Sequence, residues 1–203
     1  MYREKFKKAR KIFIKHNGVL RTSTAIKLGI HPKTLYTMHK QGYIELLARG
    51  LYKLTEHKEF VNTDLITVAK KIPGGVVCLI SALSFHEITT QIPHAIDIAI
   101  PLKSCKPKLD YPPIRVYWYS EKSFKAGIEK IKIDEIEIRI YSVEKTLADC
   151  FKYRNKIGLD VAMEALKLAF QRKKVDINKL LSYAKLNRCE KIIKPYVEII
   201  AHE

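Results

Sequence analysis

Several features of secreted and membrane proteins are missing from this chain of 203 residues. Its four cysteines form no C-x-x-C pair, which argues against a zinc ribbon or a dense disulfide framework. The longest uncharged stretch, residues 72–85, has 14 residues, whereas roughly 20 are needed to cross a bilayer. The first residues carry scattered basic side chains and no apolar block, so no signal peptide is predicted. We therefore expect a cytoplasmic protein without a membrane partner.

Acidic residues are also scarce. The chain has 21 Asp plus Glu against 38 Lys plus Arg, a net charge of +17. Residues 1–60 alone hold 14 basic and 4 acidic side chains, a net of +10. A hydrophobic content of 47% argues against a disordered polycation. The charge predicts a folded protein with a polyanionic partner, either nucleic acid or anionic lipid.

Two helices are predicted at the start of the chain. The first has its apolar residues at three- and four-residue spacing, which places them on one face, and it ends at Gly18. Those apolar residues are Tyr2, Phe6, Ala9 and Phe13. Hydroxyl side chains within residues 21–24 can cap a short second helix, which Gly29 ends.

A third helix and a hairpin follow. Pro32 suits the first position of a helix, and Gly42 ends it. The strand-like residues 43–47 and 51–54 are joined by a short turn with Arg49 at its tip. Helix, short helix, turn, helix and hairpin are the order of a winged helix-turn-helix, a fold whose third helix fits the major groove of DNA.

The third helix has two predicted faces. Leu35, Met38 and His39 share one face, which we expect to be buried. The opposite face is expected to meet the major groove. Its residues are Lys33, Thr34, Tyr36, Thr37 and Lys40.

Other contacts to DNA are expected around this helix. Thr22 and Ser23, at the start of the second helix, should contact phosphate, and Arg49 should enter the minor groove. We assign residues 1–58 to this DNA-binding domain. Two alternatives stay open from the residues alone: such a module can dock another protein, and a basic amphipathic first helix can lie on a membrane surface.

The rest of the chain, residues 59–203, is predicted to form a larger α+β domain in which strands precede a helical carboxy-terminal part. Expected strands cover residues 95–100, 114–119, 128–133 and 136–140. Expected helix caps are Asn62, Ser81, Ser142 and Asp176, and expected later helices include residues 159–171 and 187–200.

This domain offers little recognisable chemistry. It has no G-x-S-x-G, phosphate loop or H-E-x-x-H motif, so we expect no catalytic residue, metal or cofactor. The alternative is a nuclease-like enzyme, in which Asp97, Glu137 and Lys145 would assist metal-dependent DNA cleavage. Otherwise, the acids Glu144 and Asp149 are expected on the polar face of a helix, and His86 and His94 at helix ends or in loops.

A second basic cluster occupies residues 167–194, with nine basic against two acidic side chains, a net of +7. It could extend a DNA footprint, receive an acidic protein or form a solvated helical exterior. Its role stays open.

Three segments resemble the AbiEi antitoxins and related regulators. They are Pro32-x-x-Leu35 with Gly42-Tyr43-Ile44-Glu45-x-x-x-Arg49-Gly50-Leu51-Tyr52, then Ser81-Ala82-Leu83-Ser84-Phe85-His86-Glu87-Ile88-Thr89 with Ile92-Pro93, and Ser142-Val143-Glu144-Lys145-Thr146-Leu147-Ala148-Asp149. Their order and spacing cover nearly the whole chain. Lys145 departs from the arginine that is frequent at its position in that family.

This resemblance implies a non-enzymatic DNA-binding repressor of its own operon. The amino-terminal winged helix would bind inverted repeats in the promoter as a monomer or weak dimer, and the carboxy-terminal domain would counteract a nucleotidyltransferase toxin.

Overall fold

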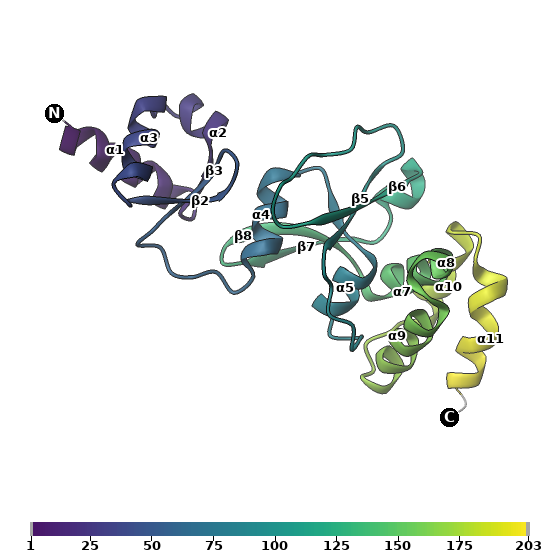
Figure 1. Ribbon diagram of the computed structural model, residues 1–203. Coiled ribbons are helices and arrows are strands. Elements are labelled where there is room, and N and C mark those ends of the chain that lie inside the picture. Colours follow the sequence, from purple (N-terminus) through teal and green to yellow (C-terminus); the bar gives the residue numbers. More distant parts are fainter. Residues whose placement is uncertain (1, 202–203) are drawn as a thin grey trace. The chain divides into compact units, whose positions relative to one another are not determined.

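A computed structural model describes residues 2–201 as two compact units (Figure 1). Unit 1 comprises the chain up to Pro73, together with Pro107–Pro113 and Lys132–Ile138. Unit 2 comprises Gly74–Lys106, Ile114–Ile131 and the chain from Arg139 onward. The predicted α+β class is confirmed, with an amino-terminal winged helix-turn-helix and a helical carboxy-terminal part. Across the described chain, no helix combines the length and the apolar character needed to cross a membrane.

Unit 1 contains a winged helix-turn-helix followed by a further helix. Its elements are α1 (Tyr2–Lys15), β1 (Val19–Arg21), α2 (Thr22–Lys27), α3 (Pro32–Lys40), β2 (Ile44–Ala48), β3 (Leu51–Leu54) and α4 (Thr63–Lys71). The three strands form an antiparallel sheet in the order β1-β3-β2. The sequence predicted the hairpin but not β1, whose three residues complete this sheet.

The core of this winged helix forms where the apolar faces of its helices meet. Ala9 and Phe13 of α1 are buried, as predicted, and Phe6 is partly buried; the side chain of Tyr2 lies outside the described part of the chain. Leu35 and Met38 of α3 join the same cluster. Because this packing uses one side of α3, the other side is left at the surface.

A five-stranded sheet has the strand order β6-β5-β4-β8-β7, and most of its residues belong to unit 2. The strands are β4 (Val76–Val77), β5 (Ile96–Pro101), β6 (Ile114–Tyr119), β7 (Ile128–Ile133) and β8 (Ile136–Tyr141). Strand β5 pairs antiparallel with β4 and parallel with β6. The bounds of β6 and β7 agree with the prediction, whereas β5 is shifted by one residue at both ends and β8 extends one residue further.

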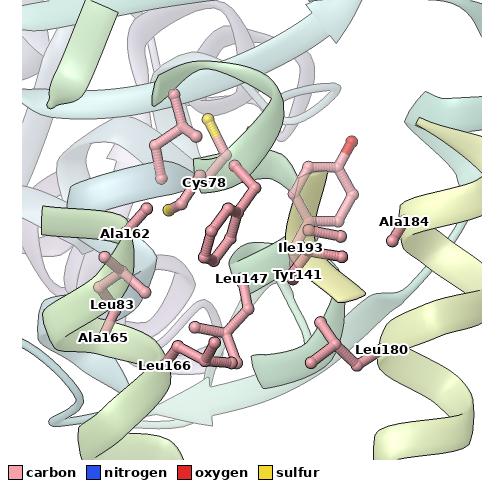
Figure 2. Close-up of a cluster of buried hydrophobic side chains, with 14 of the residues drawn as sticks. Cys78, Leu83, Tyr141, Leu147, Ala162, Ala165, Leu166, Leu180, Ala184 and Ile193 are labelled. Atoms are coloured by element: carbon pink, nitrogen blue, oxygen red, sulfur yellow. The ribbon is translucent and has the colours of Figure 1, made fainter. Parts of the chain in front are cut away.

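Helices supply most of the core of unit 2. They are α5 (Leu79–Phe85), α6 (Glu121–Lys125), α7 (Val143–Lys152), α8 (Arg154–Ile157), α9 (Leu159–Gln171), α10 (Ile177–Leu186) and α11 (Glu190–Ala201). Figure 2 shows Leu147 of α7 among side chains from the neighbouring helices, including Leu166 of α9 and Leu180 of α10. Helix α7 is therefore central to this unit.

Helix caps were predicted with mixed success. The caps at Asn62, Ser142 and Asp176 are confirmed, because each side chain accepts a hydrogen bond from a backbone N–H of its own first turn. The expected cap at Ser81 is wrong: α5 begins at Leu79, and the Ser81 hydroxyl accepts a hydrogen bond from Asp97 N at 2.8 Å. The last helix begins at Glu190 rather than at residue 187.

Candidate nucleic-acid interface

Helix α3 starts and stops where local chemistry dictates. Its N-cap is His31, whose Nδ1 accepts a hydrogen bond from Lys33 N at 3.1 Å. Pro32 occupies the first turn, where a backbone N–H has no partner within the helix, so its lack of an N–H costs no hydrogen bond. After the helix, Gly42 adopts φ +76°, a left-handed conformation that glycine tolerates best, and the chain turns into β2.

The outward face of α3 carries cations, a hydroxyl and an aromatic ring. Lys33 and Lys40 are exposed, and Tyr36 is 68% exposed. Thr37 is half-buried, and its Oγ1 donates a hydrogen bond to Lys33 O at 2.7 Å, so its free capacity is as an acceptor. This face is rich in the groups that contact DNA bases and phosphates.

Two residues of α3 lie on the opposite face from the one expected. Thr34 is only 7% exposed, and His39 is exposed. The buried side is centred on Met38, from which Thr34 is displaced by about 40° around the helix and His39 by about 100°. His39 instead packs edge-on against Tyr52 of β3, with ring centroids 5.6 Å apart. Thr34 is therefore a core residue, and His39 joins α3 to the hairpin.

The hairpin presents Arg49 at its tip. Strands β2 and β3 pair up to Ala48 and Leu51, and Gly50 closes the turn with φ +72°. The Arg49 side chain is exposed. An exposed guanidinium on a narrow hairpin has the shape and charge to enter a minor groove.

The start of α2 is tied to this tip. Thr22 N donates a hydrogen bond to Gly50 O at 2.9 Å. Arg21 occupies the N-cap position, so the predicted hydroxyl cap is wrong; Thr22 and Ser23 lie in the first turn. Thr22 is half-buried and Ser23 is exposed. Both residues are thus placed next to the wing.

Two further cations join Arg49, and the sequence did not single them out. Lys71, the last residue of α4, donates from Nζ to Arg49 O at 2.6 Å. Arg21 lies opposite Leu51 in the β1–β3 pairing. Burial lowers the pKa of Lys71, and the positive charges of Arg21 and Arg49 lower it further, whereas Asp110 raises it. These cations are far apart in sequence, so only the fold reveals the cluster.

Not every lysine of unit 1 is available to an anion. The side chain of Lys53 is 1% exposed, and its Nζ lies 2.9 Å from Glu45 and 3.1 Å from Glu59. Burial lowers the pKa of Lys53, but the two carboxylates raise it above its ordinary value. The Lys53 ammonium therefore stays protonated, and the carboxylates of Glu45 and Glu59 already balance its charge.

Asp97, one of the residues considered for nuclease chemistry, is engaged in an ion pair with Arg115. Asp97 is fully buried, and its Oδ1 accepts from Arg115 Nε at 2.8 Å. Burial raises its pKa to about 6, against the opposing charge of Arg115. Within residues 2–201, no group of three or more His, Cys, Asp and Glu side chains is arranged to hold a metal ion.

Lys145 and Asp149 form a buried ion pair in α7, contrary to the expectation that Asp149 lies on a polar face. Both side chains are 0% exposed, and Lys145 Nζ lies 2.5 and 2.6 Å from the two carboxylate oxygens. Asn187 Nδ2 donates to Asp149 Oδ1 at 2.7 Å, and Ser123 Oγ donates to Asn187 Oδ1 at 2.8 Å. Burial lowers the pKa of Lys145 and raises that of Asp149, while each opposite charge counteracts the shift.

The remaining expectations for unit 2 concern histidine and surface charge. His86 is the C-cap of α5, as predicted, and its ring contacts Tyr141 O at 2.7 Å. All nine basic side chains of residues 167–194 are exposed. Two of them, Arg172 and Lys174, face Glu87 at 3.7 and 3.6 Å.

Comparisons with known proteins bear on these features. The crystal structure of the RV2827C protein from Mycobacterium tuberculosis is similar to this chain, with a TM-score of 0.59 at 12% sequence identity. The match covers 87% of this chain and 69% of that one, and at this identity it supports the fold alone. No curated protein matches the chain. Residues 7–55 match the family described as "Transcriptional regulator, AbiEi antitoxin", so the predicted resemblance to these regulators is confirmed for the segment that contains α3 and the wing.

Proposed function

We propose that this protein is a DNA-binding transcriptional repressor that autoregulates its operon and also acts as an antitoxin. The observation that carries the proposal is the joint exposure of the α3 cations and Arg49 within the segment that matches the AbiEi family. Residues 1–58 would form the DNA-binding domain. Their targets would be inverted repeats in the promoter, bound in the cytoplasm.

The proposed interface combines helix and wing. Lys33, Tyr36, Thr37 and Lys40 would face the major groove, while Arg49 would enter the minor groove. Contacts to phosphate would come from Thr22 and Ser23, and from Arg21 and Lys71 beside the wing. Thr34 is left out of this set because its side chain is buried.

The antitoxin role is assigned to residues 59–203, which would act without catalysis. A cognate nucleotidyltransferase toxin is the proposed target, as the resemblance to AbiEi antitoxins implies. Because DNA binding and the antitoxin role are assigned to different domains, residues needed for DNA binding should be dispensable for protection from the toxin.

A separation-of-function experiment tests this proposal. Cells would carry a reporter under the native promoter and an inducible copy of the nucleotidyltransferase that is proposed as the cognate toxin. The Lys33→Ala/Arg49→Ala double variant should lose repression yet still protect the cells from the toxin. Repression by the double variant at wild-type strength would contradict the DNA interface, and failure of the wild-type protein to protect would contradict the antitoxin role.

A further inference from the structure

A mostly apolar cavity of about 520 Å³ lies in the winged helix. Its residues come from α1, from α3 and the turn that follows it, and from the end of β3. Among them are Lys7 and Arg10 of α1, Met38 of α3 and Tyr43 of the turn. The volume falls within the range of about 300 to 1,000 Å³ that is typical of small-molecule sites.

The walls of this cavity are largely built from apolar groups. Met38 and Leu54 are buried core residues whose side chains border it. Phe6 and Tyr43 meet edge-on, with ring centroids 5.5 Å apart, and Tyr43 is 55% exposed. The Thr55 hydroxyl donates to Gly42 O at 2.7 Å and fixes one side. Such walls suit an aromatic ring or a short alkyl group.

The charged side chains of the cavity, Lys7, Arg10 and Glu56, leave one net positive charge. Arg10 and Glu56 form an ion pair, with a second hydrogen bond from Arg10 Nη2 to Glu56 Oε2 at 3.2 Å. Lys7 adds an exposed ammonium to this pair. A neighbouring hollow on α1, which shares Lys7 and Arg10, is also lined by Lys8, Lys11 and Glu4.

We propose that this cavity binds a small amphiphilic organic monoanion. An aromatic or alkyl group would occupy the apolar walls, and a carboxylate or sulfonate would be held by Lys7 through a charge-assisted hydrogen bond. Met38 lies on α3 and Gly42 directly follows it, so the ligand contacts the helix of the proposed DNA interface. This link to DNA rests on the proposed function, but binding of the ligand does not.

Two fluorescent probes of nearly the same shape separate the apolar and ionic parts of the site. Anilinonaphthalene sulfonate carries one negative charge, and N-phenylnaphthylamine is its neutral counterpart. Titrated into the full-length protein, the sulfonate should saturate at one molecule per chain. Lys7→Glu should weaken its binding about tenfold and change the binding of the neutral probe less than about twofold.

Two further variants guard against nonspecific binding. Lys15→Glu makes the same charge change on an exposed position of α1 away from the cavity, and it should alter the affinity for the sulfonate less than about twofold. Tyr43→Ala removes part of a wall and should weaken both probes about fivefold. Far-ultraviolet circular dichroism and thermal unfolding verify that each variant is folded.

Two results would overturn the site. Equal losses of sulfonate affinity in Lys7→Glu and Lys15→Glu would show attraction to the overall charge only. Unchanged binding of both probes to a folded Tyr43→Ala variant would place them elsewhere on the protein.

Discussion

Helices α3 and α7 use lysine in opposite ways. Each begins at a side-chain cap and carries a lysine in its first turn, Lys33 in α3 and Lys145 in α7. Lys33 is exposed, whereas Lys145 is fully buried against Asp149. The difference follows from packing: α7 is enclosed by α5, α9 and α10, while α3 buries only one side. A lysine is therefore available to DNA only where the fold leaves it unneutralised.

The buried pair of α7 gives the largest expected effect. Asp149→Ala should lower the free energy of unfolding by about 3 to 5 kcal/mol, because it leaves the Lys145 ammonium buried without its partner. Replacing both residues, as Lys145→Met with Asp149→Leu, should recover much of that loss. Urea denaturation measures all three proteins. A loss below about 1 kcal/mol in the single variant would show that α7 tolerates a free lysine as α3 does.

The buried carboxyl group of Asp97 in unit 2 should make the free energy of unfolding depend on pH. Burial, opposed by Arg115, raises the pKa of Asp97 to about 6, so the folded protein holds this proton more tightly than the unfolded chain. The resulting stability is present at low pH and is lost as the pH rises through about 6. From this group, the free energy of unfolding should fall by up to about 3 kcal/mol between about pH 4 and pH 6.

Asp97→Asn isolates this effect. Denaturation midpoints of both proteins across the interval should differ in slope, with the variant flatter because it has no proton to lose there. Parallel curves would mean that Asp97 titrates normally.

The exposed side of α3 and the wing should matter for DNA and not for stability. Replacing Lys33 or Arg49 by Ala should weaken binding to the specific promoter site by about 1 to 3 kcal/mol where that side chain reads a base. Fluorescence anisotropy measures this loss. Lys15→Ala, an exposed change on α1, serves as the matched control. Equal losses on specific and random DNA would make the residue a phosphate contact.

Two threonines of α3 sharpen the contrast between its faces. Thr34→Ala should reduce the free energy of unfolding by about 1 kcal/mol and leave DNA affinity unchanged, because Thr34 packs in the core. Thr37→Ala should change the free energy of unfolding by less than about 0.5 kcal/mol and should weaken DNA binding. Thermal melts and the anisotropy assay give both numbers. The reverse pattern would mean that the faces are misassigned.

Local pattern explains what could be predicted from the sequence. Strands β6 and β7 and helix α9 were placed with the observed bounds because their apolar periodicity and flanking residues are unambiguous. Helices α6 and α8 and strand β1 were missed because they have five, four and three residues, too few to show a period.

Burial of charge could not be predicted, because it depends on tertiary neighbours. Lys145 and Asp149 are an i,i+4 pair, and so are the exposed Lys125 and Glu121. The spacing is the same although the order of the charges is reversed, and the surrounding helices bury only the first pair. The grouping of Lys71 with Arg49 is likewise invisible in a linear chain, since 22 residues separate them.

The salt dependence of promoter binding tests the central claim most directly, namely that α3 and the wing together hold duplex DNA. With about six phosphates neutralised, the logarithm of the binding constant should fall against the logarithm of salt concentration with a slope near −5. Arg49→Ala should reduce the steepness by about one where Arg49 contacts phosphate. A binding constant that does not change with salt would contradict the claim.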